Sequence, residues 1–269
     1  MSRIKEISTI LAAAGHPRIG TESPFKLISN DTYLLRFFLS EFLPSRKILV
    51  NGGFSASGLP SKECEFLDID SMKWLHVPAM AYPHHGSYIQ SSSTCFCDGK
   101  FIVIGGSDDR TGYHNKSETI STTTSGMASS WTELTPEMPA ERAYQCVASV
   151  GNKVFVIGGI DNYHTSWPPY CFDLKTSAWS EIEPMPNHRF GAMVAVVGSR
   201  IFIIGGAIHG NVARFVQLVE SYDTETGKWK THSPMPVNRI GAACSVVGDQ
   251  IWMFGRSEER RVGKECRSR

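Results

Sequence analysis

The sequence predicts an all-β fold built from repeated units of about 50 residues. Two observations lead to this prediction: short runs rich in β-branched residues recur along the chain, and a pair of glycines ends most of them. Such runs are too short for helices and suit buried strands. The 269 residues, 41% hydrophobic and 20% charged, are typical of a folded chain of one large domain or two smaller ones.

The glycine motifs recur at nearly constant spacing, and other residues recur with them. The first glycines, Gly52, Gly105, Gly158, Gly205 and the single Gly255, lie 53, 53, 47 and 50 residues apart. Each complete pair is followed by a tryptophan, at Trp74, Trp131, Trp179 and Trp229. After each of the last three tryptophans comes a Met-Pro dipeptide, at Met138-Pro139, Met185-Pro186 and Met235-Pro236. Each dipeptide is followed by an arginine, at Arg142, Arg189 and Arg239. Each arginine precedes the next first glycine by 16 residues.

This pattern resembles the kelch repeat over residues 48–255. The two best copies are Phe172–Trp179 and Tyr222–Trp229, each preceded by its glycine pair. The resemblance implies a β-propeller, in which four-stranded blades surround a central channel. The aromatic residues Phe172, Trp179, Tyr222 and Trp229 are large enough to fill the wedge between adjoining blades.

The individual elements support an incomplete propeller. Runs such as Met193–Val197 and Ile201–Ile204 are predicted to be strands joined by a glycine-containing turn. Three full four-stranded blades are expected around Gly105, Gly158 and Gly205. Two partial blades are expected at the ends, with strands at Ile48–Gly53, Phe66–Ile69 and Trp74 in the first, and at Ile240–Val247 and Ile251–Phe254 in the last. A ring that does not close exposes unpaired strand edges.

Three regions follow from this interpretation. Residues 1–47 are an N-terminal segment without repeat motifs, either a helical remnant, with a short amphipathic helix over Thr32–Leu43, or disordered. Residues 48–255 are the kelch repeats. Residues 256–269 are expected to be a non-native tail, because their sequence resembles the in-frame translation of a sequencing adapter; the alternative is a solvated basic tail.

Composition excludes several classes of protein. The formal net charge is +1 and gives no basic excess for nucleic acid. No apolar run approaches the roughly 18 residues of a membrane helix. The seven scattered cysteines and the poor N-terminal secretion signal favour a cytoplasmic protein with free thiols.

No catalytic or metal-binding signature is found. The sequence lacks the phosphate-binding, nucleophile-elbow and zinc-protease motifs, so we expect neither an enzyme nor a cofactor. His84-His85 and Cys95-x-Cys97 match no standard zinc spacing, and we expect no metal site.

A binding surface is what remains. In kelch propellers the residues after each glycine pair and the arginine after Met-Pro commonly lie where loops surround the channel mouth. Carried over by position, the candidate partner-binding residues are Phe54, Ser107, Asp109, Ile160, Asn162, Ala207, His209, Arg142, Arg189 and Arg239. The arginines either contact an acidic or phosphorylated partner through bidentate hydrogen bonds, or link adjacent blades through loop carbonyls. At the first junction, Tyr82–His85 replaces the arginine.

The resemblance implies a protein–protein interaction module, expected to be the substrate-recognition propeller of a kelch-like ubiquitin-ligase adaptor. Its partner would be a protein or peptide, with a cullin-based ligase involved if a BTB domain lies upstream. The alternatives are an actin-associated kelch scaffold and a kelch-fold carbohydrate enzyme, a mutarotase or oxidase, because fold alone does not fix function.

Overall fold

The structure, a computed structural model, describes residues 47–51, 61–68, 73–84, 93–108, 112–121, 130–163, 165–210 and 213–254. All regular structure within these ranges is β-strand, which confirms the predicted all-β fold. The predicted helix over Thr32–Leu43 and the predicted tail at 256–269 lie outside the described residues.

The described strands form antiparallel sheets that follow one another along the chain, here called sheets 1 to 5. Sheet 1 contains β1 (Lys47–Asn51), β2 (Cys64–Asp68) and β3 (Lys73–Val77). Sheet 2 contains β4 (Thr94–Cys97), β5 (Lys100–Asp108), β6 (Gly112–Ser121) and β7 (Trp131–Glu133). Sheet 3 contains β8 (Cys146–Val150), β9 (Lys153–Ile157), β10 (Tyr170–Asp173) and β11 (Ala178–Glu181).

The remaining strands continue the same order. Sheet 4 contains β12 (Met193–Val197), β13 (Arg200–Ile204), β16 (Val219–Asp223) and β17 (Lys228–Thr231). Sheet 5 contains β18 (Ala243–Val247) and β19 (Gln250–Phe254), and a small ribbon pairs β14 (Ala207–Ile208) with β15 (Arg214–Phe215). The strand predicted over Ile240–Val247 begins only at Ala243, because the residues after Arg239 form the turn into sheet 5.

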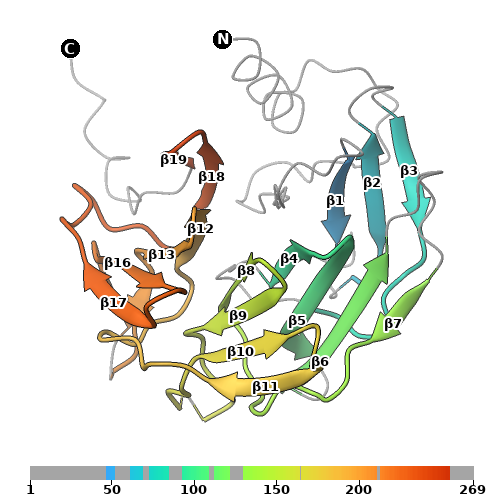
Figure 1. The fold of residues 1–269 in the computed structure, drawn as a ribbon, viewed down its shortest axis with the longest axis horizontal. Helices are drawn as coiled ribbons and strands as arrows, with labels where there is room; N and C mark the ends of the chain where they lie inside the picture. Colours follow the sequence, from blue (N-terminus) through green and yellow to red (C-terminus); the bar gives the residue numbers. More distant parts are fainter. Residues whose placement is uncertain are drawn as a thin grey trace, which may run out of the picture.

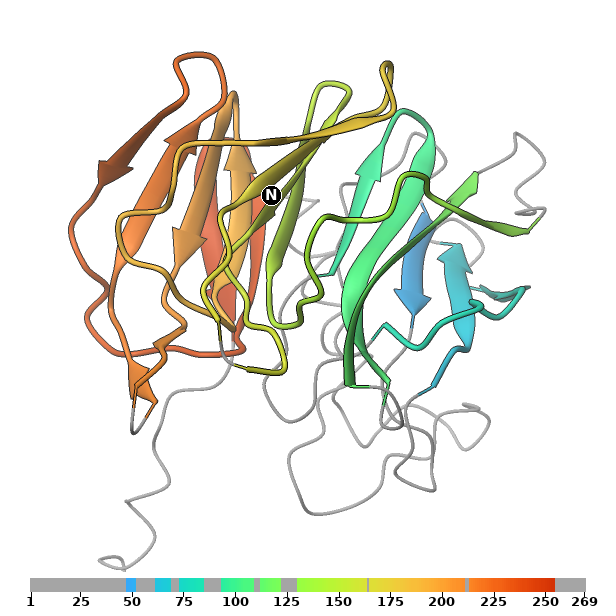
Figure 2. The ribbon, with the colours of Figure 1, turned by 90° about the horizontal axis from the view of Figure 1, so that it is seen from below.

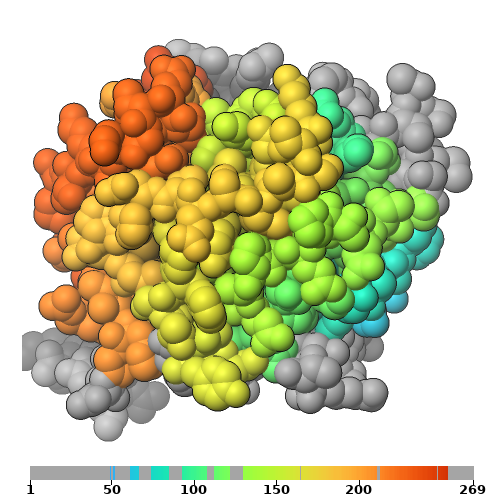
Figure 3. All heavy atoms as spheres, turned by 60° about the horizontal axis from the view of Figure 1, so that its bottom comes forward, coloured from blue at the N-terminus to red at the C-terminus, as the bar shows by residue number. Residues whose placement is uncertain are grey.

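The sheets stand around a common axis as propeller blades do (Figure 1). The innermost strands β4, β8, β12 and β18 lie next to one another in that order. Seen from the side, the sheets stand next to one another, and the ribbon β14–β15 lies at the lower edge of the view (Figure 2). On the outer surface, green, yellow and orange residues of sheets 2, 3 and 4 adjoin (Figure 3). Within the described residues the arc of sheets does not close into a ring.

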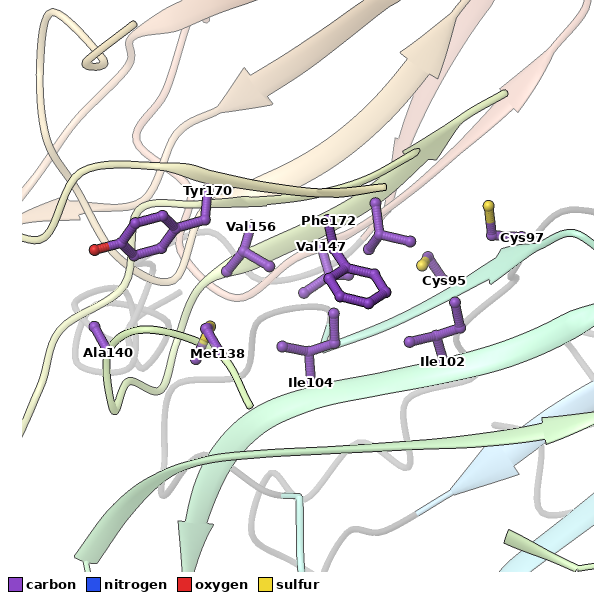
Figure 4. Packing of buried hydrophobic residues seen from close by; sticks show 11 residues of the cluster. Cys95, Cys97, Ile102, Ile104, Met138, Ala140, Val147, Val156, Tyr170 and Phe172 are labelled. Carbon is purple, nitrogen blue, oxygen red and sulfur yellow. The ribbon is translucent and has the colours of Figure 1, made fainter. Parts of the chain in front are cut away.

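The hydrophobic core is divided among the junctions between sheets. Between sheets 2 and 3, Ile102 and Ile104 of β5 pack against Val147 of β8 and Phe172 of β10 (Figure 4). Tyr222 takes the same place at the next junction, where its ring lies 6.1 Å from that of Phe155. These two rings therefore fill the wedge between blades, as the sequence predicts.

The repeated tryptophans also link successive sheets. The indole nitrogen of each of the last three donates a hydrogen bond to a carbonyl that follows the preceding sheet: Trp131 to Pro78 at 2.7 Å, Trp179 to Pro136 at 2.9 Å, and Trp229 to Glu183 at 2.8 Å. These three tryptophans thus join the outer strand of one sheet to the connection from the sheet before it.

Candidate functional site

The loops that follow the glycine pairs and the loops that carry the arginines meet at one end of the sheets. Two isolated β-bridges join them, Ala143 with Ile160 and Phe190 with Ala207. We call this end the junction face.

Each arginine joins two successive sheets. Its backbone carbonyl accepts a hydrogen bond from the second glycine of the preceding pair: Gly106 to Arg142 at 2.9 Å, Gly159 to Arg189 at 3.1 Å, and Gly206 to Arg239 at 2.8 Å. In the first two arginines the guanidinium donates to the carbonyl of the glycine 16 residues later. These distances are 3.3 Å for Arg142 Nη1 to Gly158 and 2.9 Å for Arg189 Nε to Gly205. The repeated spacing of 16 residues is explained by this contact.

The glycines are required because the arginine carbonyls approach so closely. A Cβ atom on Gly158 would lie 2.3 Å from the carbonyl oxygen of Arg189, and one on Gly205 would lie 2.4 Å from that of Arg239. Both glycines also have positive φ, at 70° and 66°. Any larger residue would force the next sheet away.

Arg189 is a fully paired internal residue. It is 1% exposed, and Nη1 forms an ion pair with the carboxylate of Glu220, which is itself fully buried. Nη1 also donates to the carbonyl of Asn187, and Nη2 to that of Ile203, both at 2.8 Å. The side chain of Arg189 therefore links blades and offers no surface to a partner.

Arg142 is equally buried but differently paired. Nη2 donates to the carbonyl of Pro168 at 3.1 Å, and the guanidinium lies 5.0 Å from the centre of the Tyr170 ring. Nε is buried without a hydrogen-bond partner. No acid lies within ion-pair distance among the described residues. Burial lowers the pKa of Arg142 to about 10, although Tyr170 and Asp161 act in the opposite direction. The side chain is thus a buried cation with no carboxylate bound to it.

The other predicted site residues are distributed between core and surface. Ser107, Ile160 and Ala207 are buried, with Ile160 and Ala207 in an apolar cluster at the junction face. Asn162 is exposed and accepts a hydrogen bond from the backbone of Tyr113 at 3.0 Å, and His209 is exposed. Arg239 is half-buried. Phe54 and Asp109 lie outside the described residues.

The connection from Asp161 to Trp167 presents aromatic side chains at the junction face. The Asp161 carboxylate accepts hydrogen bonds from the backbone of Tyr163 at 2.9 Å and of Thr165 at 2.6 Å, and from the Trp167 indole at 3.1 Å. Tyr163 is 88% exposed and Trp167 is 37% exposed. One buried carboxylate therefore fixes a loop that holds two aromatic side chains in solvent.

His188 lies between this loop and the arginines. Its Nδ1 is 2.9 Å from the Ser166 hydroxyl, and its Nε2 is buried without a hydrogen-bond partner. Burial lowers the pKa of His188 to about 4, and the positive charges of Arg142 and Arg189 act in the same direction. His188 is therefore neutral at physiological pH. The repeat pattern does not identify this residue, because it belongs to no motif.

Tyr144 has a conformation that glycine adopts at the other junctions. At the next two junctions the residue two positions after the arginine is a glycine: Gly191, with φ of 61°, and Gly241, with φ of 60°. Tyr144 has this position after Arg142, and its φ is 61°. This region is costly for a bulky residue. The ring packs edge-on against Tyr113 at 5.7 Å and lies 6.1 Å from Phe190. Comparing the three copies of the motif in the sequence identifies Tyr144 as the exception.

The first junction has a histidine in place of the arginine. His84 Nδ1 lies 2.6 Å from the carbonyl oxygen of Gly105, and its Nε2 lies 3.0 Å from a carboxylate oxygen of Glu118. His84 thus binds the first glycine of a pair and a buried glutamate, as Arg189 does. Its distance from that glycine is 21 residues instead of 16, so the spacing does not reveal it.

Two further observations concern chemistry and membranes. No group of three or more His, Cys, Asp or Glu side chains in the described ranges is placed to hold a metal ion. Cys95 and Cys97 lie in the apolar cluster between sheets 2 and 3. The part of the chain that the structure describes contains no helix long and apolar enough to span a bilayer.

Blade-like sheets around one axis, glycine pairs closed by the next arginine, and wedge-filling aromatics together define a β-propeller of the kelch class. The comparison with protein families agrees: residues 42–256 match the model described as the KLHDC2/KLHL20/DRC7 Kelch-repeats domain. The chain therefore belongs to this kelch-repeat family, and its repeats form a protein–protein interaction module. No curated protein matches the chain.

Proposed function

We propose that the chain is the substrate-recognition propeller of a kelch-like ubiquitin-ligase adaptor, and that it binds an acidic or phosphorylated segment of its partner beside Arg142. The observation that supports this most is the difference between buried cations at the junction face. Arg189 is paired with Glu220, whereas Arg142 has no carboxylate within ion-pair distance among the described residues. A buried positive charge that is not neutralised attracts an anion to the surface above it.

The loop from Asp161 to Trp167 supports the same location. Interfaces are enriched in tyrosine and tryptophan, and a loop ordered before binding loses less conformational entropy when a partner arrives. Tyr163 and Trp167 are such side chains, and the Asp161 carboxylate accepts hydrogen bonds from the backbone of Tyr163 and from the indole of Trp167. Because His188 is neutral, it adds no second positive charge beside this loop, and buried Arg142 acts on an anionic partner through its field at the surface and not by direct contact.

A peptide-binding measurement tests the site. The probes are two fluorescein-labelled peptides of the same length, one alternating glutamate with leucine and one with glutamine in place of glutamate. We expect the glutamate peptide to bind more tightly, with an affinity that falls as salt is added. Tyr163→Ala is expected to weaken binding by about tenfold, because exposed aromatic contacts of this kind carry about 1–2 kcal/mol or more.

The matched control is Lys175→Ala, an exposed substitution in the turn between β10 and β11 at the opposite end of sheet 3. It should leave peptide binding unchanged. Equal binding of the glutamate and glutamine peptides would reject an acidic partner, and equal binding by wild type and Tyr163→Ala would reject this location.

The ligase role is tested separately. A kelch-like adaptor delivers its partner to a cullin-based ligase through a BTB domain, so the proposal requires that domain in the same protein. Depleting the protein from cells should raise the abundance of the partner it binds, and a cullin should co-purify with it. Unchanged partner abundance would contradict the adaptor role and favour an actin-associated scaffold.

A further inference from the structure

One exposed hydroxyl at the junction face is hydrogen-bonded to a buried imidazole nitrogen. Ser166 lies in the loop from Asp161 to Trp167 and is exposed, and its Oγ lies 2.9 Å from Nδ1 of His188. A second pair of this kind, Ser221 with Nε2 of His232 at 2.8 Å, is closed to solvent because Ser221 is 1% exposed. Ser166 is therefore accessible from outside and connected to the interior of the site.

The ring of His188 has hydrogen-bonding capacity that it does not use. Its Nε2 is buried and has no hydrogen-bond partner among the described residues. A neutral imidazole carries one donor and one acceptor, and a serine hydroxyl suits either one. An anion in place of that hydroxyl would be an acceptor only, so it would favour the ring with a proton on Nδ1 and stabilise the imidazolium form.

The charges around His188 also favour an anion at this point. Burial and the positive charges of Arg142 and Arg189 together lower the pKa of His188 to about 4. Arg142 Nη2 donates to the carbonyl of Pro168, two residues after Ser166, and its Nε is buried without a partner in the described ranges. A negative charge on Ser166 would therefore lie in the field of a buried cation and beside an imidazole that can become one.

One carboxylate in the same loop opposes that charge. The oxygens of Asp161 accept hydrogen bonds from the backbone of Tyr163 and Thr165 and from the indole of Trp167. Burial by itself would raise the pKa of Asp161, but these hydrogen bonds outweigh it and lower the pKa. Asp161 is buried whereas Ser166 is exposed, so an anion on Ser166 has solvent available on the side away from this carboxylate.

We propose that Ser166 is a phosphorylation site and that its phosphate switches off the binding of an anionic partner at the junction face. A protein kinase would transfer the γ-phosphoryl group of ATP to Oγ. The bond from Oγ to phosphorus forms, the bond from that phosphorus to the oxygen bridging to the β-phosphate breaks, the hydroxyl proton is released and ADP leaves. The inference rests on the function proposed above, because the phosphate supplies within the chain the anion that a partner would otherwise bring.

The phosphate has one effect on the partner and another on the chain itself. It carries a charge of about −1.5 to −2 near neutral pH, so it offsets the positive field of Arg142 and repels an acidic or phosphorylated segment. It also raises the pKa of His188, because a negative charge next to the ring favours the imidazolium form. The second effect needs no partner, and the two are measured separately.

The full chain with phosphoserine incorporated at position 166 during translation tests the switch. With the fluorescein-labelled glutamate peptide we expect binding about tenfold weaker than that of the unmodified chain, the size of one charge-assisted contact. The matched control is phosphoserine in place of Thr176, an exposed residue in the turn between β10 and β11. It adds the same charge at the opposite end of sheet 3 and should leave peptide binding unchanged.

Imidazole nitrogen shifts of the same proteins test the contact between the phosphate and His188. The pKa of His188 should rise from about 4 toward its ordinary value near 6.5 in the chain phosphorylated at 166, and should stay at about 4 in the control. An unchanged His188 would overturn the proposal whether or not the peptide binds. A shifted His188 with equal peptide binding by the two chains would overturn the switch. An unmodified chain that binds no glutamate peptide would instead reject the function proposed above, and the switch with it.

Phosphorylation itself is measured on the full chain produced in animal cells. Fragment-ion mass spectrometry of the tryptic peptide 154–175, which contains Ser166, locates the modified residue. We expect phosphate on Ser166 and none on this peptide in Ser166→Ala. An unmodified peptide, or phosphate on Tyr163 or Thr165 alone, would overturn Ser166 as the site.

Discussion

Arg142, Arg189 and His84 occupy corresponding places at three junctions, but the charges around them are balanced in different ways. Arg189 and His84 each face a buried glutamate, whereas Arg142 faces two carbonyls and the ring of Tyr170. Replacing one member of a buried ion pair usually costs more than removing a cation that has no such partner. The same position in the repeat therefore serves as a structural link at two junctions and leaves an unbalanced charge at the third.

The burial of His188 makes the stability of the fold depend on pH. The folded chain keeps His188 neutral, with a pKa of about 4, while in the unfolded chain its pKa lies near 6.5. Between these values the unfolded state binds more protons, so this contribution is fully present above about pH 6.5 and is lost as pH falls toward about 4. We expect the free energy of unfolding of the wild type to fall by on the order of 2 kcal/mol over that range because of His188. His188→Gln should not show this loss.

Urea unfolding of wild type and His188→Gln at a series of pH values measures the difference. The two free energies of unfolding should converge as the pH falls and diverge as it rises, with the wild type gaining stability relative to the variant. A constant difference between the two proteins would contradict a lowered pKa at His188.

At the scale of the element, the glycine pair is what allows one sheet to follow another so closely. The glycines at hairpin turns and those at junctions have similar backbone conformations but different surroundings. Gly198, between β12 and β13, has φ of 60° and open space where a Cβ atom would lie, whereas Gly158 has φ of 70° and the Arg189 carbonyl oxygen 2.3 Å from that position.

Alanine substitutions at these two glycines separate conformation from contact. Gly198→Ala should cost about 1 kcal/mol of unfolding free energy, the penalty for a left-handed conformation. Gly158→Ala should cost at least about 2 kcal/mol more, because its Cβ overlaps the Arg189 carbonyl and displaces sheet 4. Thermal and urea unfolding of both variants provide the comparison. Equal losses would show that backbone conformation alone decides the need for glycine at the junction.

The sequence predicts the repeated elements well because the same contact recurs. An arginine 16 residues before a glycine, and a tryptophan after it, mark hydrogen bonds that successive junctions repeat, so their spacing is visible without a structure. His84 performs the same role from a different distance and is therefore not recognised. The spacing also does not show whether an arginine side chain points to solvent or to a carbonyl, and the predicted partner contacts of Arg189 depended on that choice.

The loop from Asp161 to Trp167 shows a second limit. It occurs once, so no repeat indicates which of its polar residues organises it. Only the structure identifies Asp161 as the acceptor that orders its aromatic side chains and His188 as their neighbour. Features that depend on one loop packing on another are the ones that repeat analysis misses.

At the scale of the whole molecule, one edge of β19 in the last described sheet has no paired strand among the described strands, whereas the corresponding edge is paired in sheets 3 and 4. In sheets 3 and 4 the second strand has a neighbour on both sides, as β9 has β8 and β10. Within the described residues β19 pairs only with β18, and its residues Trp252 and Met253 are 41% and 39% exposed. An unpaired edge with exposed apolar residues favours pairing with another chain.

The full chain should therefore associate with itself in a concentration-dependent manner. Sedimentation velocity over a range of protein concentrations should show species larger than the monomer, and Trp252→Lys should reduce them, because a charge on an edge strand opposes further strand pairing. Val237→Lys is the matched control: Val237 is 44% exposed but lies in the loop before Arg239, outside β19. It should leave association unchanged. A wild-type chain that stays monomeric at every concentration, or equal effects of the two lysines, would mean that β19 is covered within its own chain.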